Sequence, residues 1–170
     1  GCVYKEHTAH GRSRICIAQR DDAKRASIAS LLDDMGIRYR LSSYGRQIEF
    51  TNRAMADHLG LFGCGAHERH LLPYVKDATP ELLECFLETY CLGDGTHRKS
   101  RRLSYTTSSR QLADDIHEIL AKLGKAGTLT LKERAGSVTT IEGREVVRAH
   151  DTYNVNERSL SRSAWIDKAK

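Results

Sequence analysis

An acidic residue between two glycines closes an apolar stretch in the middle of this sequence. The segment LLECFLETYCLGDGTH (82–97) ends its apolar part with Gly-Asp-Gly, in which the acid is Asp94. Thr79 and Pro80 favour the start of a helix, so we expect one helix to lead to Asp94. Because a helix C-terminus carries partial negative charge, a carboxylate there is better explained if a cation lies beside it. Asp beside Gly also suits an ordinary turn, and the residues alone leave both interpretations open.

The residues that follow Asp94 indicate which cation this would be. Mg²⁺ takes one or two protein carboxylates and completes its shell with water and phosphate oxygens. The stretch from Gly95 to Arg110 contains no acid and these basic residues: Arg98, Lys99, Arg101, Arg102 and Arg110. Basic residues clustered in this way bind the phosphates of nucleic acids. The pattern therefore predicts Asp94 as a ligand of Mg²⁺ beside a phosphate-facing strand.

A second group of residues has the chemistry of metal ligands but not the spacing. Cys64, His67 and His70 follow one another at intervals of three residues. Structural zinc sites take four ligands, and no fourth ligand lies at a usual spacing, so we assign these residues to a linker. The odd number of cysteines and the lack of a CxxC pair disfavour a disulfide framework. They favour a reducing compartment inside the cell.

Two segments on either side of the central helix align without a gap. They are RICIAQRDDAKRASIASLLDDMG (14–36) and RLSYTTSSRQLADDIHEILAKLG (102–124), and their apolar residues coincide at helical spacing. Asp21 and Ser109 coincide as N-caps, and Gly36 and Gly124 coincide where each helix should end. Alternating residues predict a strand before each helix, and a hairpin is expected after it. Chance alignment of two amphipathic helices is the alternative. However, the strand before the helix, the N-cap, the apolar stripe and the glycine at the helix end all coincide in the two segments.

Each half is therefore predicted as strand, helix, strand, strand, which is an α+β fold with antiparallel sheets. The helix between the halves carries two stripes of side chains. One is apolar (Leu83, Phe86, Leu87 and Tyr90) and one is small (Cys85, Thr89 and Gly93). Small side chains would let another backbone come close, although a plain core helix with small residues by accident is the alternative.

Net charge and hydropathy limit the classes of binding partner that the chain can have. The formal net charge is +5, which permits a polyanionic partner without requiring one. The sequence has no run of about 18 apolar residues and no signal peptide, so no membrane partner is expected.

The motif and its surroundings resemble a known family. LETYCLGDG (87–95) resembles the motif of the LAGLIDADG homing endonucleases, in the form found in inteins. YTTSSRQLADDIHEILAKLG (105–124) and DTYNVNERS (151–159) are similar to the segment that follows this motif and to the closing strand. The resemblance implies a pseudo-twofold pair of αββαββ units whose sheets form a saddle on double-stranded DNA. It implies repeats over 1–59 and 79–158, a linker over 60–78 and a C-terminal extension over 159–170, which Trp165 is expected to pack onto the body.

The resemblance also implies roles for individual residues. Asp94 matches the catalytic aspartate that binds Mg²⁺. Gln19, whose counterpart is Thr107, would position water near the metal, or would simply flank a helix. Lys132, on one face with Thr128 and Thr130, would be a basic residue near the scissile phosphate and a DNA contact, or an ordinary sheet residue. The other expected DNA-binding residues are Arg12, Arg14, Arg38, Arg40, Arg46, Arg98, Lys99 and Arg102.

The sequence departs from the family pattern at its start. The repeat places Gly1 opposite Gly95, so the partner of Asp94 would precede Gly1, and the first motif helix is expected to be missing. We therefore expect the DNA endonuclease domain of an intein, with the splicing domain and host protein in cis, inactive as this fragment alone. The alternative is a cleavage-inactive module of the same fold that binds DNA or RNA, as a transcription regulator or a maturase would.

Overall fold

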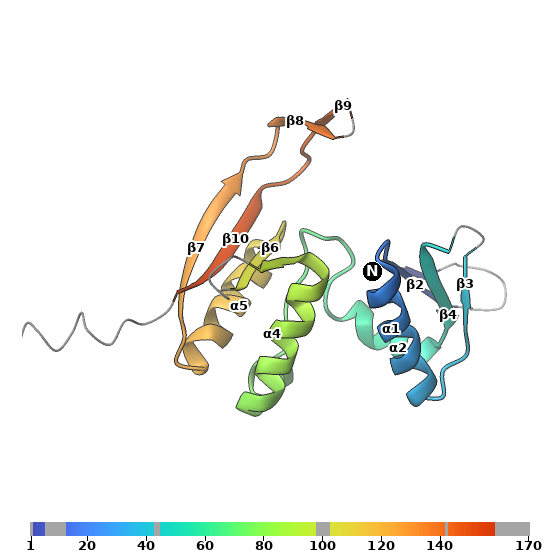
Figure 1. The fold of residues 1–170 in the computed structure, drawn as a ribbon. Coiled ribbons are helices and arrows are strands. Elements are labelled where there is room, and N and C mark those ends of the chain that lie inside the picture. The colour runs from blue at the N-terminus through green and yellow to red at the C-terminus, as the bar shows by residue number, and fades with distance from the viewer. Residues whose placement is uncertain (1, 6–12, 43–44, 98–102, 142, 159–170) are drawn as a thin grey trace, which may run out of the picture. The chain divides into compact units, whose positions relative to one another are not determined.

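The computed structural model describes residues 2–5, 13–42, 45–97, 103–141 and 143–158 (Figure 1). The chain divides between Cys64 and Gly65 into two compact units, which we call the N-terminal unit and the C-terminal unit. No helix within the described ranges has the length and apolar character needed to cross a membrane.

The N-terminal unit is a four-stranded antiparallel sheet with two helices. Its elements are β1 (Cys2–Lys5), β2 (Ser13–Ala18), α1 (Asp22–Asp34), β3 (Tyr39–Leu41), β4 (Gln47–Thr51) and α2 (Arg53–Gly60). The strands lie in the order β1-β2-β4-β3. Ile15, Ile48 and Phe50 point from the sheet into a core that Leu32 of α1 and Ala56 of α2 complete.

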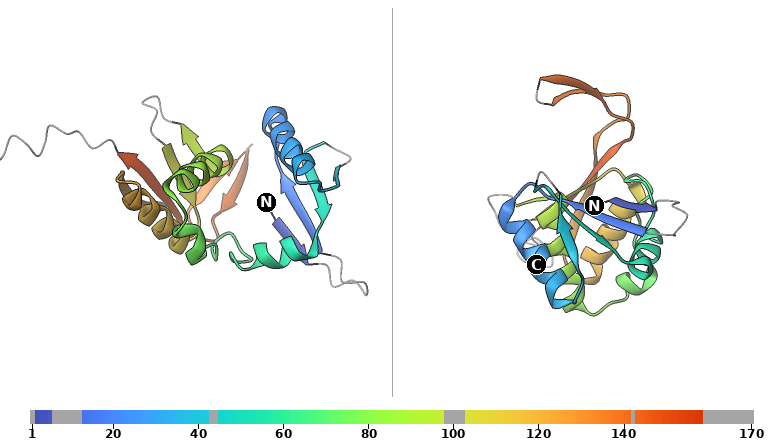
Figure 2. Two further views of the ribbon diagram at one scale, coloured as in Figure 1. Left: turned by 90° about the horizontal axis from the view of Figure 1, so that it is seen from below. Right: turned by 90° about the vertical axis from the view of Figure 1, so that its right-hand side faces the viewer.

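The C-terminal unit repeats this plan on a larger scale. Its elements are α3 (Pro73–Lys76), α4 (Pro80–Asp94), β5 (Gly95–His97), β6 (Leu103–Thr107), α5 (Arg110–Lys122), β7 (Ala126–Glu133), β8 (Val138–Ile141), β9 (Arg144–Val147) and β10 (Thr152–Arg158). The sheet order is β5-β6-β10-β7, and β8 pairs with β9 in a separate hairpin. Figure 2 shows the long β7–β10 ribbon extending beyond the helices of this unit to the β8–β9 hairpin.

The predicted repeat is confirmed by the two sheets, because corresponding strands occupy corresponding places. Both helices of the repeat begin with a capping side chain: Asp21 accepts a hydrogen bond from the backbone N–H of Lys24, and Ser109 accepts one from that of Leu112. Both helices are followed by a glycine with positive φ, 66° at Gly36 and 67° at Gly124. This left-handed conformation costs glycine little, so the same local signal ends each helix.

The two units differ in the helix that covers their first two strands. In the C-terminal unit, α4 packs on β5 and β6, whereas in the N-terminal unit α2 packs on β1 and β2. Equivalent strand pairs are therefore covered from different positions in the chain.

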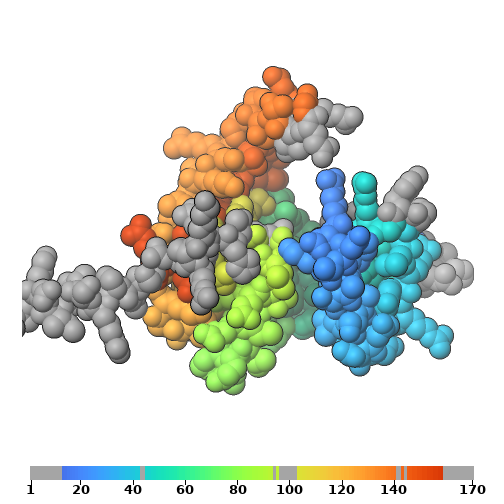
Figure 3. Space-filling view, in the orientation of Figure 1, coloured from blue at the N-terminus to red at the C-terminus, as the bar shows by residue number. Residues whose placement is uncertain are grey.

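Helix α4 separates the two predicted stripes onto different faces. Leu83 and Leu87 are buried with Cys91, whereas Cys85, Thr89 and Gly93 of the small stripe are exposed. Pro80 begins the helix, as predicted, although the N-cap Thr79 makes no side-chain capping hydrogen bond. Figure 3 shows α4 (green) lying along the surface of the C-terminal unit.

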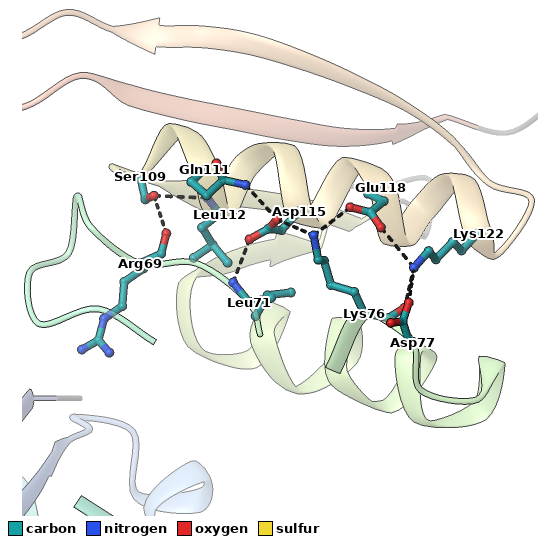
Figure 4. Close-up of polar contacts among 10 residues, drawn as sticks. All are labelled: Arg69, Leu71, Lys76, Asp77, Ser109, Gln111, Leu112, Asp115, Glu118 and Lys122. Atoms are coloured by element: carbon teal, nitrogen blue, oxygen red, sulfur yellow. Dashed lines mark hydrogen bonds and ion pairs between the residues drawn. The ribbon is translucent and has the colours of Figure 1, made fainter. Parts of the chain in front are cut away.

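A network of hydrogen bonds and ion pairs attaches residues 69–77 to α5 (Figure 4). The carboxylate of Asp115, 2% exposed, accepts the backbone N–H of Leu71 at 2.7 Å and lies 3.2 Å from the Lys76 ammonium. Lys76 also binds Glu118 at 3.0 Å. Much of the segment expected as a linker over 60–78 is therefore a packed part of the C-terminal unit, whose boundary falls after Cys64.

Candidate functional site: a helix end and a polar sheet face

The backbone that carries Asp94 is fixed by close packing at the end of α4. Asp94 is the last residue of the helix, and Gly95 enters β5 at once. A Cβ atom on Gly95 would lie 2.5 Å from both Cα and Sγ of Cys91, so a side chain there would collide with the helix. A Cβ atom on Gly93 would meet nothing within 4 Å. The side chain of Asp94 lies outside the described part of the structure.

One face of the C-terminal sheet carries hydroxyl and amide side chains, while the other faces the helices. Tyr105 of β6 and Val155 of β10 are fully buried and directly opposite each other on the helix side. Alternation along the strands puts their neighbours on the opposite face. We call this opposite face the polar face, and it consists of Ser104, Thr106, Thr128, Thr130, Asn154 and Asn156.

Hydrogen bonds connect the side chains of the polar face across β6 and β10. Asn154 Oδ1 accepts from Thr106 Oγ1 at 2.9 Å and lies 3.2 Å from Ser104 Oγ, whose single proton is closer to Asn156. Asn156 Oδ1 accepts from Ser104 Oγ at 3.0 Å and from Asn154 Nδ2 at 3.1 Å. These contacts hold both amides in place before any ligand binds.

Lys132 lies at an irregularity of the same sheet. Leu131 pairs with Tyr153 and Glu133 pairs with Thr152, so two consecutive residues of β10 face three of β7. Lys132 is therefore the extra residue of a β-bulge, a feature that re-aims a side chain. Its side chain is exposed, as a residue that contacts DNA must be.

Gln19 and Thr107 make the same contact in the two units. Gln19 Oε1 accepts the backbone N–H of the N-cap Asp21 at 3.0 Å, and Thr107 Oγ1 accepts that of the N-cap Ser109 at 3.1 Å. Each side chain is therefore held at a helix start. The shared geometry agrees with their alignment as counterparts and leaves their proposed role toward water a prediction.

The predicted arginines of the N-terminal unit lie on and beside its sheet. Arg14 of β2 and Arg40 of β3 lie on the face opposite the core, where Arg40 binds Glu49 of β4 through Nε at 2.9 Å and Nη2 at 2.7 Å. Arg38 and Arg46 are exposed next to this sheet. The remaining predicted DNA-binding residues lie outside the described part of the chain: Arg12, Arg98, Lys99 and Arg102. Trp165 lies outside it too.

The second group of candidate metal ligands does not converge on one point. The ring of His67 stacks on His150 with centroids 3.9 Å apart, and His70 Nδ1 lies 3.1 Å from the carbonyl oxygen of Glu68. Among the described residues, no three His, Cys, Asp or Glu side chains are gathered as metal ligands. A metal bound by His67 or His70 would therefore need further ligands, such as water or phosphate.

Sequence comparison assigns the helix, the sheet and the polar face to one family. Residues 81–158, which run from the start of α4 to the end of β10, match the family model of the LAGLIDADG-like domain. The C-terminal unit contains a LAGLIDADG-like domain. The predicted family resemblance is thereby confirmed for the part of the chain that carries Asp94.

Solved structures extend the LAGLIDADG fold to nearly the whole chain. I-DmoI in complex with DNA and Mn matches 93% of this chain and 82% of its own, with a TM-score of 0.61 and 14% identity. I-DmoI in complex with DNA and Ca matches 94% and 76%, with a TM-score of 0.61 and 15% identity. Mesophilic variants of the homing endonuclease I-DmoI match 94% and 82%, also at a TM-score of 0.61. The predicted fold class is confirmed by these similarities.

A curated relative places a similar segment in a much longer protein. The replicative DNA helicase DnaB of Nostoc sp. strain PCC 7120 is 35% identical over 86 residues. The match covers 47% of this chain and only 10% of the relative.

The amides of the polar face were not among the predicted site residues. The sequence analysis selected basic residues, whereas Asn154 and Asn156 are neutral and appear only in the segment DTYNVNERS. The alternation Asn-Val-Asn, with an apolar residue between two polar ones, is the local signal that indicates one exposed face.

Proposed function

We propose that this chain is the DNA-binding and DNA-cleaving part of an intein-encoded LAGLIDADG homing endonuclease, which hydrolyses both strands of a specific duplex with a divalent cation. The observation that carries the proposal is the position of Asp94 in the LAGLIDADG-like domain. It ends a helix whose exposed face carries small residues, and the contact between Gly95 and Cys91 fixes the backbone beside it.

The carboxylate of Asp94 fits a cation that is shared with the substrate. Mg²⁺ needs only one or two protein carboxylates when phosphate oxygens and water complete its shell. We propose that Asp94 holds Mg²⁺ together with a second acid and the DNA. A cation bound in this way polarises a phosphoryl oxygen and lowers the pKa of a bound water. The I-DmoI complexes with Mn and with Ca support a divalent cation.

The remaining residues are proposed to bind and orient the DNA. Lys132, aimed by the bulge in β7, would contact a phosphate near the cleaved bond, and Gln19 would orient water from the helix start that it flanks. The arginines of the N-terminal sheet would contact the duplex, together with the basic residues beyond the described part. This group comprises Arg12, Arg14, Arg38, Arg40, Arg46, Arg98, Lys99 and Arg102.

The intein context is proposed from the curated relative. A segment similar to this chain forms a tenth of a replicative DNA helicase, which supports a LAGLIDADG domain carried within a longer host polypeptide. In that setting the splicing domain and the host protein would be partners in cis, inside the cell where the DNA target lies.

A second candidate is a cleavage-inactive module that binds nucleic acid through the same sheets. It is favoured by a polar face whose side chains hold one another by hydrogen bonds and would bind nucleic acid without a metal. The two candidates differ in whether the Asp94 carboxylate is needed for a chemical step.

Substitution of Asp94 separates the two candidates. The segment, kept within its parent polypeptide, is used to select a bound duplex from a random library, and cleavage of that duplex is measured with Mg²⁺. Asp94→Asn should abolish cleavage and leave binding equal or tighter, because the amide removes a charge that repels phosphate. Asp114→Asn on α5, the same chemical change at a surface ion pair, should cut normally. Binding without cleavage by the parent would favour the cleavage-inactive module.

A further inference from the structure

Glu49 and Asn156 occupy equivalent positions in the two sheets. The repeat aligns Ile17 of β2 with Tyr105 of β6, and these residues pair with Ile48 and Val155. Glu49 and Asn156 each come next along the strand, so both lie on the face opposite the core. Their cross-strand neighbours are also equivalent, because Glu49 faces Arg40 and Asn156 faces Thr128.

In the N-terminal sheet, the residue at this position, Glu49, forms an ion pair with Arg40. Glu49 Oε2 accepts both Nε and Nη2 of Arg40, at 2.9 Å and 2.7 Å. The Arg40 side chain is 67% exposed and that of Glu49 14% exposed, so the cationic end faces outward. At this position the sheet presents a guanidinium.

The C-terminal sheet presents an amide whose oxygen is already engaged. Asn156 Oδ1 accepts two hydrogen bonds, one from Ser104 Oγ and one from Asn154 Nδ2. Ser104 is only 5% exposed, so it acts from beneath the amides. No hydrogen bond from Asn156 Nδ2 occurs within the described ranges, and this nitrogen keeps both N–H groups for a ligand.

This arrangement changes what an asparagine can recognise in the major groove. Asparagine usually pairs with adenine in a bidentate manner, accepting from N6 with its oxygen and donating to N7. Asn156 offers donors only, because its oxygen is occupied by the sheet. Guanine presents two acceptors, N7 and O6, on the same edge, whereas adenine presents one acceptor beside a donor. The amide of Asn156 therefore matches guanine.

We infer that Asn156 determines specificity by donating from Nδ2 to a guanine in the half-site bound by the C-terminal sheet. Ser104 is the positioning residue that keeps the amide oxygen turned away from the base. The inference rests on the proposed binding of duplex DNA through the sheet faces. It predicts that the two half-sites differ at this position, because the equivalent residue of the N-terminal unit is a glutamate bound to Arg40.

Selection of duplexes from a randomised library by the full chain, at one fixed salt concentration, tests the inference. The unaltered chain should select guanine at one position of one half-site. Asn156→Asp has nearly the same shape and reverses the hydrogen-bonding character, so it should select cytosine, whose N4 amino group donates. Preference for guanine at that position should fall by about 10-fold or more.

Ser104→Ala provides a second test that does not alter the contacting residue. It removes one of the two donors that occupy the Asn156 oxygen, so adenine should become acceptable while guanine is still bound. Glu49→Gln is the matched control at the equivalent position, and it should leave the base preference of this half-site unchanged. Circular dichroism and thermal unfolding identify any variant that has lost the fold.

The outcomes distinguish this inference from the proposed function. If all folded variants bind DNA and select the same sequence as the unaltered chain, Asn156 does not read a base, although the chain remains a DNA-binding protein. If the unaltered chain binds no duplex, or binds with an affinity that does not depend on salt, the proposed function fails and the inference fails with it.

Discussion

The carboxylate of Asp115 accepts the backbone N–H of Leu71 at 2.7 Å, joining α5 to a segment 44 residues earlier in the chain. The same carboxylate accepts from Gln111 Nε2 and lies beside the Lys76 ammonium. Asp115 is thus a buried charge with three partners. Removing it takes this acceptor away from the buried N–H of Leu71 and one acceptor away from the Lys76 ammonium, whose side chain is 21% exposed, which is the costly case for a buried polar group.

We predict that Asp115→Ala lowers the free energy of unfolding of the C-terminal unit by about 3 kcal/mol. Urea unfolding monitored by circular dichroism measures this change. Asp114→Ala, one residue earlier, removes only a surface pair with Arg110 and should cost less than about 1 kcal/mol. Equal effects of the two substitutions would show that the Leu71 attachment contributes little to stability.

The same network makes stability depend on pH at both extremes. Hydrogen bonds from Lys76 and Lys122 lower the pKa of Glu118 below its usual 4.5, so this carboxylate stabilises the fold above that pH and stops doing so as the pH falls through its lowered pKa. Hydrogen bonds to Glu118 and Asp115 raise the pKa of Lys76 above 10.5. Its contribution is therefore complete below that pH and is lost as the pH rises through the raised pKa.

Unfolding free energies measured from acidic to alkaline pH test this dependence. Glu118→Gln should destabilise the chain most between about pH 5 and pH 10, and the difference from the unaltered chain should shrink as the pH falls from 4.5 through the lowered pKa of the folded-state carboxylate. Glu145→Gln, at an exposed residue of β9, is the matched control for the loss of one surface charge. A difference that stays constant in acid would mean that Glu118 acts by packing rather than by charge.

Local signals explain why the repeat could be predicted from the sequence. The caps at Asp21 and Ser109 are made within three residues, and the glycines that end the helices need only their own φ. The burial of the aligned stripes could not be predicted in the same way. Ile119 lies on α5, which contacts α3 and α4, and is fully buried, whereas its counterpart Leu31 on α1 is 59% exposed.

Contacts between distant residues account for the part of the site that the sequence did not reveal. Asn154 meets Thr106 across 48 positions because β10 inserts between β6 and β7. The sequence shows alternation but not which strand becomes the neighbour, so the amide network could not be read from it. Asp94 could be selected from the sequence because its signal, an acid at a helix end between two glycines, is contained in three residues, and its role stays a prediction.

The glycines on either side of Asp94 should respond differently to substitution. Gly95→Ala would place a Cβ atom 2.5 Å from Cys91 Cα and should lower the free energy of unfolding by about 2 kcal/mol, the usual cost of overpacking. Gly93→Ala has open space and lies within α4, so it should raise that free energy by about 0.5–1 kcal/mol. Thermal unfolding of both variants tests the pair. Tolerance of alanine at position 95 would mean that β5 leaves α4 by another path.

Removing the hydroxyl of Tyr105 and removing that of its neighbour Tyr90 should change the free energy of unfolding in opposite directions. Tyr105 is fully buried, its hydroxyl has no hydrogen-bond partner within the described ranges, and burial raises its pKa. Tyr105→Phe removes an unsatisfied polar atom and keeps the ring, so the free energy of unfolding should rise by about 1 kcal/mol.

Tyr90, whose ring centroid lies 6.2 Å away, donates its hydroxyl to the Thr106 carbonyl at 3.0 Å. Tyr90→Phe should therefore lower that free energy by about 1 kcal/mol. Urea unfolding of the two variants under one set of conditions compares them directly, and a loss of stability in Tyr105→Phe would reveal a partner for the buried hydroxyl.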